Sequence, residues 1–156
     1  GSGDDTLRGA GEADILIGGE GDDVLIGRGG RDTLTGDAGD DVLIGRGGRD
    51  TLTGGAGSDR FQFNNQGRDE ITDFSLSDGD IIQIETSAYS EDAQATIYID
   101  TFQNIRRMGT GNFAYATDRD RLFYDADGDW QRGNDRQRIV DTNDFGDPTE
   151  ANFEWM

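Results

Sequence analysis

The chain has 156 residues and a formal net charge of −19, with 33 acidic residues against 14 basic residues that are all arginine. Such an anionic protein attracts cations and repels nucleic acid and acidic membrane surfaces, so neither of these is an expected partner. Cysteine and histidine are absent, which excludes disulfide bonds, thiolate or imidazole metal sites and the commonest general base.

The start of the chain shows no targeting or spanning segment. No N-terminal signal peptide is visible, and no apolar run approaches the roughly 20 residues that a membrane-spanning helix needs. Because the sequence opens in mid-pattern at "GSGDD", we expect it to be a fragment of a longer protein.

The first 62 residues repeat a nine-residue unit. A large apolar residue recurs at every ninth position, a glycine-rich turn lies before it, and an aspartate ends each turn two residues ahead of the apolar one. The apolar residues are Leu7, Leu16, Leu25, Leu34, Leu43, Leu52 and Phe61, and the aspartates are Asp5, Asp14, Asp23, Asp32, Asp41, Asp50 and Asp59. Seven units in register indicate a repeat architecture.

The unit predicts a six-residue turn followed by a three-residue strand. Glycine allows the positive φ angles of tight turns, and the central apolar residue of each strand points opposite to its neighbours. Two units close one coil, so the fifteen letters "DDVLIGRGGRDTLTG" at Asp22–Gly36 return at Asp40–Gly54. Coils stacked at about 4.8 Å would place the leucines between two parallel sheets. We therefore predict an all-β protein, a parallel β-roll.

The turns themselves predict calcium. One large side chain per nine residues is too little apolar surface to offset the entropy of ordering so much glycine. Stacked turns also bring aspartates close together, so a cation is needed. Carbonyl and carboxylate oxygens suit a hard divalent ion, and calcium tolerates irregular geometry better than magnesium does. Aspartate also caps turns without metal, but seven in register favour calcium.

These residues resemble the RTX repeats, "GGxGxDxUx", of proteins exported by type I secretion. The best match is Gly18–Ile26, and the resemblance covers about residues 1–74. It implies that each calcium ion lies between a turn and the next turn on the same edge. The first turn would supply the carbonyls of its second and fourth positions and its aspartate. The following turn would supply the carbonyls of its first and third positions and its own aspartate.

The resemblance implies five sites, in which every interior aspartate is shared by two ions. One edge would hold Gly1, Gly3, Asp5, Gly18, Glu20 and Asp23; then Gly19, Gly21, Asp23, Gly36, Ala38 and Asp41; then Asp37, Gly39, Asp41, Gly54, Ala56 and Asp59. The other edge would hold Ala10, Glu12, Asp14, Gly27, Gly29 and Asp32, then Arg28, Gly30, Asp32, Gly45, Gly47 and Asp50.

Several turns depart from the family pattern. Ala10 and Glu12 replace glycines, so we expect a distorted or empty site at that turn, while Arg28, Asp37 and Arg46 replace a glycine but keep its carbonyl. An eighth turn, offset by one residue, ends at Asp69 and would form a sixth site with Asp50. The expected number is five or six calcium ions.

The outward strand positions differ between the two faces. One face carries an apolar ladder, Val24, Ile26, Val42 and Ile44, which we expect the C-terminal segment or a neighbouring chain to cover. The other carries Thr33, Thr35, Thr51 and Thr53; this ladder resembles those of ice-binding solenoids, although threonine is also simply a good strand former. A row of arginines, Arg28, Arg31, Arg46 and Arg49, is expected to be solvated.

The second half of the chain reads as short alternating strands. They are "FQF", "EITDF", "DIIQIE", "ATIYI", "NFAYA", "RLFYD" and "RIVD", from which we predict an antiparallel β-cap that closes the roll. The expected units are residues 1–74, the roll, and 75–156, the cap. Parts of this half also resemble the segments that follow the repeats in RTX-bearing proteases.

Two acidic stretches in this half are interpreted as hairpin turns. Asp125, Asp127 and Asp129 take the first, third and fifth places of an EF-hand loop, but Arg136 stands where that loop needs its bidentate glutamate. Asp78 and Asp80 in "SDGD" are given the same interpretation. The final "DPTEANFEWM" fits either an uncleaved export signal or a last strand.

We therefore expect a secreted, non-catalytic calcium-binding module with the type I secretion apparatus as a partner. The chain would be disordered where calcium is scarce and would fold outside the cell. Acidic pairs such as Asp118 and Asp120 are expected by chance in so acidic a chain. Two alternatives remain: the C-terminal part of a secreted protease, lipase or epimerase, and an adhesin or ice-binding segment.

Overall fold

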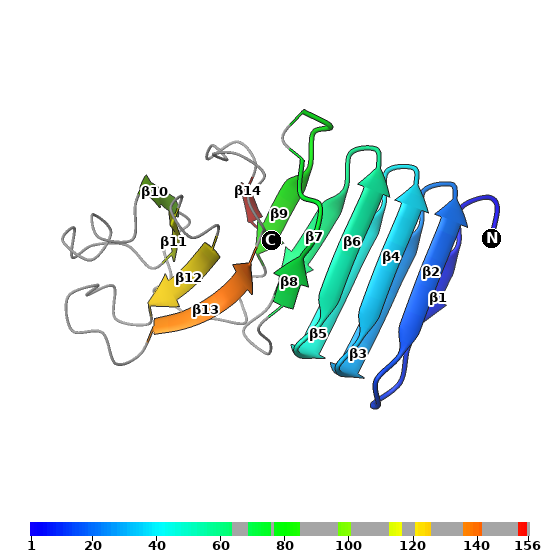
Figure 1. Cartoon of the computed structure of the whole chain (residues 1–156), viewed down its shortest axis with the longest axis horizontal. Coiled ribbons are helices and arrows are strands. Elements are labelled where there is room, and N and C mark those ends of the chain that lie inside the picture. Colours follow the sequence, from blue (N-terminus) through cyan, green and yellow to red (C-terminus); the bar gives the residue numbers. More distant parts are fainter. Residues whose placement is uncertain are drawn as a thin grey trace.

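The structure, a computed structural model, describes residues 1–63, 69–75 and 77–84, and beyond them the backbone of five strands. Every regular element in these described segments is a β-strand (Figure 1), as the repeat pattern predicts. None of the described residues forms a helix long and apolar enough to cross a bilayer.

Two parallel sheets lie face to face along the repeats, with β1, β3 and β5 behind β2, β4 and β6 in Figure 1. The first sheet contains β1 (Thr6–Arg8), β3 (Val24–Gly30), β5 (Val42–Gly48), β7 (Arg60–Phe63) and β9 (Ile81–Ile84). The second contains β2 (Ile15–Glu20), β4 (Thr33–Ala38), β6 (Thr51–Ala56) and β8 (Asp69–Ile71). The chain alternates between the sheets, so consecutive strands form the coils of a β-solenoid.

The register between coils is one eighteen-residue period, which stacks identical positions. Leu25 pairs with Leu43 in the first sheet, and Leu34 pairs with Leu52 in the second. All four leucines are fully buried between the sheets. The inner seam expected from the sequence is therefore confirmed.

The seam becomes aromatic in the last coil. Phe61, Phe63 and Phe74 are buried, and the rings of Phe61 and Phe74 lie 6.2 Å apart between centroids. Ile71 and Ile82 complete this cluster with no exposed surface. The end of the roll nearest the C-terminal strands thus has more apolar bulk than the leucine coils before it.

The strands from β2 to β6 are longer than the expected three residues, whereas β1 and β8 have three. β2, β4 and β6 have six residues, and β3 and β5 have seven. The pairing continues into the turns, where Gly29 pairs with Gly47 and Asp37 with Gly55. The three-residue expectation was wrong because it counted the turn glycines as irregular, whereas stacked identical turns also hydrogen-bond to one another.

The outward apolar ladder is partly buried in this structure. Ile26 is buried, and Val24, Val42 and Ile44 are half-buried. The most exposed large apolar side chains among the described residues lie on the other face, where Ile15 and Ile17 of β2 are 76% and 54% exposed. A covering partner for the ladder stays a prediction.

The roll continues beyond the nonapeptides. β8 pairs with β6 one residue out of the regular spacing, with Leu52 opposite Ile71, which confirms the expected offset. β9 pairs in parallel with β7 in the first sheet. The hairpin interpretation of Asp78 and Asp80 was therefore wrong, because this turn carries the chain from the second sheet to the first. The division expected at residue 74 falls in this connection and stays a prediction.

The remaining strands extend both sheets. They are β10 (Ile97–Asp100), β11 (Phe113–Ala116), β12 (Arg121–Asp125), β13 (Arg136–Asp141) and β14 (Phe153–Trp155). Strands β11, β12 and β13 are antiparallel, as expected, but β13 joins β8 and β14 joins β9 in parallel. Since Asp125 faces Arg136 across consecutive antiparallel strands, the hairpin interpretation holds there; Asp127 and Asp129 lie outside the described residues.

Candidate metal centre

The aspartates that end the turns stack into two ladders, one on each edge of the roll. The ladder of the edge built by turns 18–23, 36–41 and 54–59 contains Asp5, Asp23, Asp41, Asp59 and Asp80. The ladder of the opposite edge, built by turns 27–32 and 45–50, contains Asp14, Asp32, Asp50 and Asp69. Within each ladder, Oδ1 accepts the backbone N–H of the aspartate one coil earlier, at 2.7–3.0 Å.

The second carboxylate oxygen of five ladder aspartates has no partner. These aspartates have at most 1% of their surface exposed, and their Oδ2 atoms accept no hydrogen bond. They are Asp23, Asp32, Asp41, Asp50 and Asp59. A buried carboxylate oxygen without a donor is costly unless a cation or a proton satisfies it.

Three of the unpartnered Oδ2 atoms, those of Asp23, Asp32 and Asp41, border a space that a backbone carbonyl of the next coil also borders. A methyl group on Gly36 would collide with Asp41 Oδ2 and would lie 2.6 Å from the carbonyl oxygen of Gly54. Gly18 is placed in the same way against Asp23 and the Gly36 carbonyl. Only glycine leaves this space open. The structure thus brings together an aspartate and the first-position carbonyl of the following turn, as the resemblance implies.

The opposite edge repeats this arrangement. A methyl group on Gly27 would collide with Asp32 Oδ2 and would lie 3.0 Å from the carbonyl oxygen of Gly45. A methyl group on Gly45 would likewise collide with Asp50 Oδ2.

The third-position carbonyls of the first edge take part in hydrogen bonds between coils. Those of Glu20, Ala38 and Ala56 accept the N–H groups of Gly3, Gly21 and Gly39 at 2.6–2.9 Å. A carbonyl oxygen has two lone pairs, so each of these can still bind a cation.

The second- and fourth-position residues pack closely between coils. The carbonyl oxygen of Gly21 occupies the space that a side chain on Gly39 would need, and that of Asp37 does the same for Gly55. Gly39 and Gly55 have φ angles of 135° and 110°. Arg28, Asp37 and Arg46 adopt positive φ as well, in the places where the family pattern has glycine. The remaining predicted carbonyl donors, Gly19, Gly29, Gly30 and Gly47, belong to these same stacked turns.

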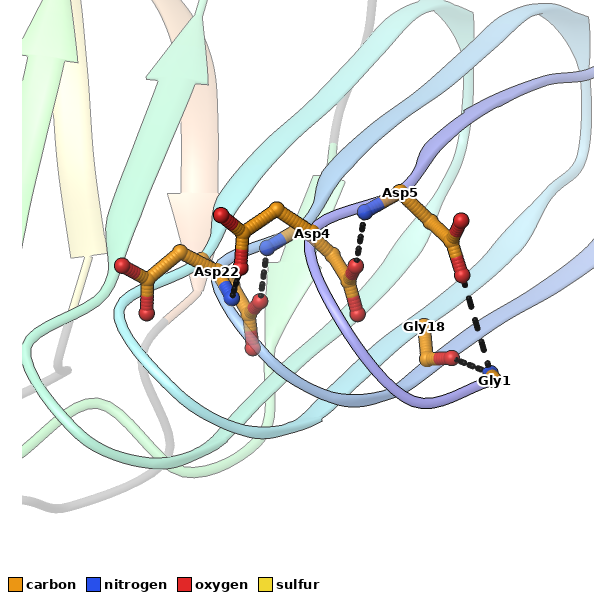
Figure 2. A network of polar contacts seen from close by, with 7 residues as sticks. Gly1, Asp4, Asp5, Gly18 and Asp22 are labelled. Carbon is orange, nitrogen blue, oxygen red and sulfur yellow. Dashed lines mark hydrogen bonds and ion pairs between the residues drawn. The ribbon is translucent and has the colours of Figure 1, made fainter.

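The first coil differs from the interior ones. Asp14 is only half-buried, and its Oδ2 accepts the N–H of Ala10 at 2.7 Å, so this turn, which also contains Glu12, is closed by its own aspartate. Figure 2 shows the amino group of Gly1 between the Gly18 carbonyl and the Asp5 carboxylate, the latter at 3.9 Å. The positive charge of the Gly1 amino group thus lies beside Asp5, and the site implied for Gly1, Gly3 and Asp5 stays a prediction.

A second, exposed row of aspartates runs outside the inner ladder. Asp4 accepts the N–H of Asp22 at 3.0 Å (Figure 2), and Asp22 accepts the N–H of Asp40 at 2.9 Å. Asp40 in turn accepts the N–H of Ser58. These exposed outer aspartates connect successive turns through one carboxylate oxygen each.

Without metal, the inner carboxylates resist ionisation. Burial, followed by repulsion from neighbouring aspartates, raises the pKa of Asp59 to about 7 and that of Asp69 to about 8. Burial also raises the pKa of Asp41 and of Asp50. The folded roll therefore holds negative charge poorly unless a positive charge enters.

Residues beyond the nonapeptides end the ladders, and the regular spacing misses them. Asp69 Oδ1 accepts the N–H of Asp50, while the sixth calcium site expected from these two residues stays a prediction. Asp80 lies 21 residues after Asp59 rather than 18, and its two oxygens accept the N–H groups of Asp59 and Ser75. Asp73 caps the N–H groups of Gly54 and Gly55. Asp80 keeps the repeat signature of an aspartate two residues before a buried apolar residue, Ile82, which could have revealed it.

The donor set is that of a hard cation. Within the described part of the chain, no group of three or more acidic side chains is arranged to hold a metal ion by itself. Each predicted site instead pairs two carboxylates with backbone carbonyls, and oxygen-only ligation of this kind suits calcium.

A family model for the RTX calcium-binding nonapeptide repeat, four copies long, matches residues 1–34 and again residues 26–61. The match covers the coils that contain the unpartnered carboxylates. A search of curated proteins found no match to the chain.

Proposed function

Because residues 1–61 are an array of RTX calcium-binding nonapeptide repeats, we propose that this chain is a calcium-binding module of an exported protein and that calcium drives the folding of its roll. The observation that carries the proposal is the row of five buried Oδ2 atoms without a hydrogen-bond partner. Three of them share a space with a backbone carbonyl oxygen of the next coil, and a bound cation would satisfy both kinds of oxygen.

The ligands of each ion come from two turns on one edge. For the central pair, Asp23 and Asp41 would supply carboxylate oxygens, and the carbonyls of Gly36 and Ala38 would join those of turn 18–23. Bound calcium supplies two positive charges per site, which cancel the repulsion along the ladder. Five or six ions would fill the roll.

Calcium dependence would tie folding to export. Extracellular calcium modules bind at roughly 10⁻⁴–10⁻³ M, far above the calcium concentration of a cytosol. The acidic, glycine-rich chain would stay unfolded inside the cell, pass a type I exporter, and fold outside as binding free energy becomes folding free energy. The role is non-catalytic, and any activity would belong to another part of the exported protein.

Circular dichroism with calorimetric titration tests the proposal. We expect the β-sheet signal to appear between chelator and millimolar calcium, with five or six ions bound per chain and no comparable gain in magnesium. The same β-content in chelator and in calcium would contradict coupled folding.

A further inference from the structure

The two edges of the roll have the same inner ladder but opposite outer charge. We call them the acidic edge, with turns 18–23, 36–41 and 54–59, and the arginine edge, with turns 27–32 and 45–50. The difference lies at the second and fifth positions of the turns, where every charged side chain is exposed. On the acidic edge the charged residues there are Asp22, Asp37 and Asp40; on the arginine edge they are Arg28, Arg31, Arg46 and Arg49.

The contrast is largest for the two central sites. The site between Asp23 and Asp41 is built from turns that contain six acidic residues and no arginine, a formal charge of −6. The site between Asp32 and Asp50 is built from turns with two acidic residues and four arginines, a formal charge of +2. Eight unit charges thus separate two sites whose inner ligands are the same.

The arginine charges are not neutralised by the described residues. None of the four side chains forms an ion pair or hydrogen bond with the part of the chain that the structure describes. Strand pairing stacks Arg28 directly against Arg46 in register, so like charges accumulate along this edge. Two of these arginines also adopt positive φ, at 81° and 70°.

The outer charges lie in the same turns as the ladder carboxylates. Asp22 directly precedes the ladder residue Asp23 on the acidic edge, and Arg31 directly precedes Asp32 on the arginine edge. Both outer side chains are exposed, whereas the ladder aspartates are buried. A negative potential at one edge attracts a cation to that edge, and a positive potential at the other edge repels it.

We propose that the two edges bind calcium with unequal affinity, so that the acidic edge fills first and the arginine edge fills only at higher calcium. The inference rests on the proposed function, because it assumes that both edges bind calcium. The two central sites differ by eight unit charges, which we place at about 10 Å from a divalent ion and screen by physiological salt. The dissociation constant should then be about tenfold or more lower at the acidic edge. The roll would then respond to calcium in two stages.

The test follows the two edges separately during a calcium titration of the full chain. Backbone amide NMR signals of turn 36–41 report the acidic edge, and those of turn 45–50 report the arginine edge. We expect the first set to reach its calcium-bound position at about tenfold lower calcium. In molar salt the two calcium midpoints should converge, because the Debye screening length shortens to about 3 Å.

Arginine variants give the matched comparison. Arg31→Gln with Arg49→Gln removes two positive charges that make no contact with the ladder, and should move the midpoint of turn 45–50 several-fold toward that of turn 36–41. Arg8→Gln is the control, because it removes an exposed positive charge from strand β1 outside the turns and should leave the ratio of midpoints unchanged.

The outcomes separate the inference from the proposed function. If calcium binds at both edges with one midpoint, or the arginine edge fills first, the inequality is wrong and calcium-driven folding stands. If the arginine variants leave the midpoints apart, outer charge is not the cause and the inference is also overturned. If no amide responds to calcium at all, the proposed function fails with it.

Discussion

At the residue scale, the ladder aspartates use their two oxygens for different purposes. In Asp41, Oδ1 accepts the Asp23 N–H and holds two coils together, while Oδ2 is buried beside the Gly54 carbonyl oxygen without a donor. Two oxygens that face each other with no hydrogen between them repel. A cation resolves this contact, and so would an N–H group.

Asp41→Asn should therefore have opposite effects with and without calcium. The amide keeps an oxygen for Asp23, and its NH₂ group can donate to the Gly54 carbonyl, so the calcium-free roll should gain stability by about 1 kcal/mol. In calcium, the variant should lose two shared ions, at a cost of about 2–3 kcal/mol for each ion present at hundredfold excess over its dissociation constant. The β-sheet signal in chelator checks the first sign, and thermal unfolding with calorimetric stoichiometry in calcium checks the second.

The adjacent residue provides the control. Asp40→Asn removes the same charge from the exposed outer row and keeps the oxygen that accepts the Ser58 N–H, so it should retain all ions and change stability by less than about 0.5 kcal/mol. If Asp41→Asn destabilises the chain equally in chelator and in calcium, Oδ2 is not a metal ligand.

At the element scale, the nine-residue period predicted the strands that follow the period and failed where the spacing between turns changes. The nine-residue spacing correctly placed β1 to β7, the leucine seam and the offset of β8. It missed Asp80 because the spacing from Asp59 to Asp80 is 21 residues rather than 18, and the last turn of that coil is closed by mutual hydrogen bonds between Ser75 and Asp80. Local turn chemistry of this kind is decided by contacts that spacing alone does not encode.

The turn glycines are predicted to be unequal, although the sequence shows them alike. In turn 27–32, a methyl group on Gly27 would collide with the Asp32 carboxylate, whereas one on Gly29 would meet nothing closer than 3.9 Å. Gly27→Ala should therefore close the cation space, lower the loaded unfolding temperature by several degrees and abolish binding at that turn. Gly29→Ala is the control within the same turn and should unfold within about a degree of the wild type.

Calcium-loaded melting curves and ion counts of the two variants check this prediction. Equal loss in both would mean that any side chain disrupts the turn, and that the space beside Asp32 has no special role. Equal tolerance would mean that the ion does not occupy that space.

At the scale of the whole molecule, the sequence predicted the type of site better than its distribution. Repeats and oxygen-only chemistry pointed to calcium, and five of the eight turn aspartates predicted as ligands have a buried, unpartnered oxygen. That Asp14 would be satisfied by the Ala10 N–H instead depends on the exposed geometry of the first coil. Burial and partner choice are three-dimensional properties, so the sequence could only suggest an irregular second turn.

The summed electrostatics of the ladders predict an unusual pH response. In the metal-free fold the pKa values of Asp59 and Asp69 are raised to about 7 and about 8, chiefly by burial, while in the unfolded chain aspartate titrates near its ordinary pKa of 3.8. A raised carboxyl pKa means that the folded state binds protons more tightly than the unfolded state. Metal-free stability should therefore be greatest in acid and should fall as pH rises from about 4 to about 8.

Calcium should reverse this slope, because calcium and protons compete for the same oxygens. Exhaustively calcium-depleted protein should gain β-sheet signal as pH falls from about 8 to about 5, still above its pI of about 4.1. In excess calcium, the same acidification should lower the unfolding temperature, since protonation displaces the ions. A double variant, Asp59→Asn with Asp69→Asn, should flatten the metal-free response. A proton and a calcium ion each stabilise this ladder by removing negative charge from the same oxygens, so they should exclude each other. Parallel pH slopes of stability with and without calcium would show that protons and calcium do not share these carboxylates.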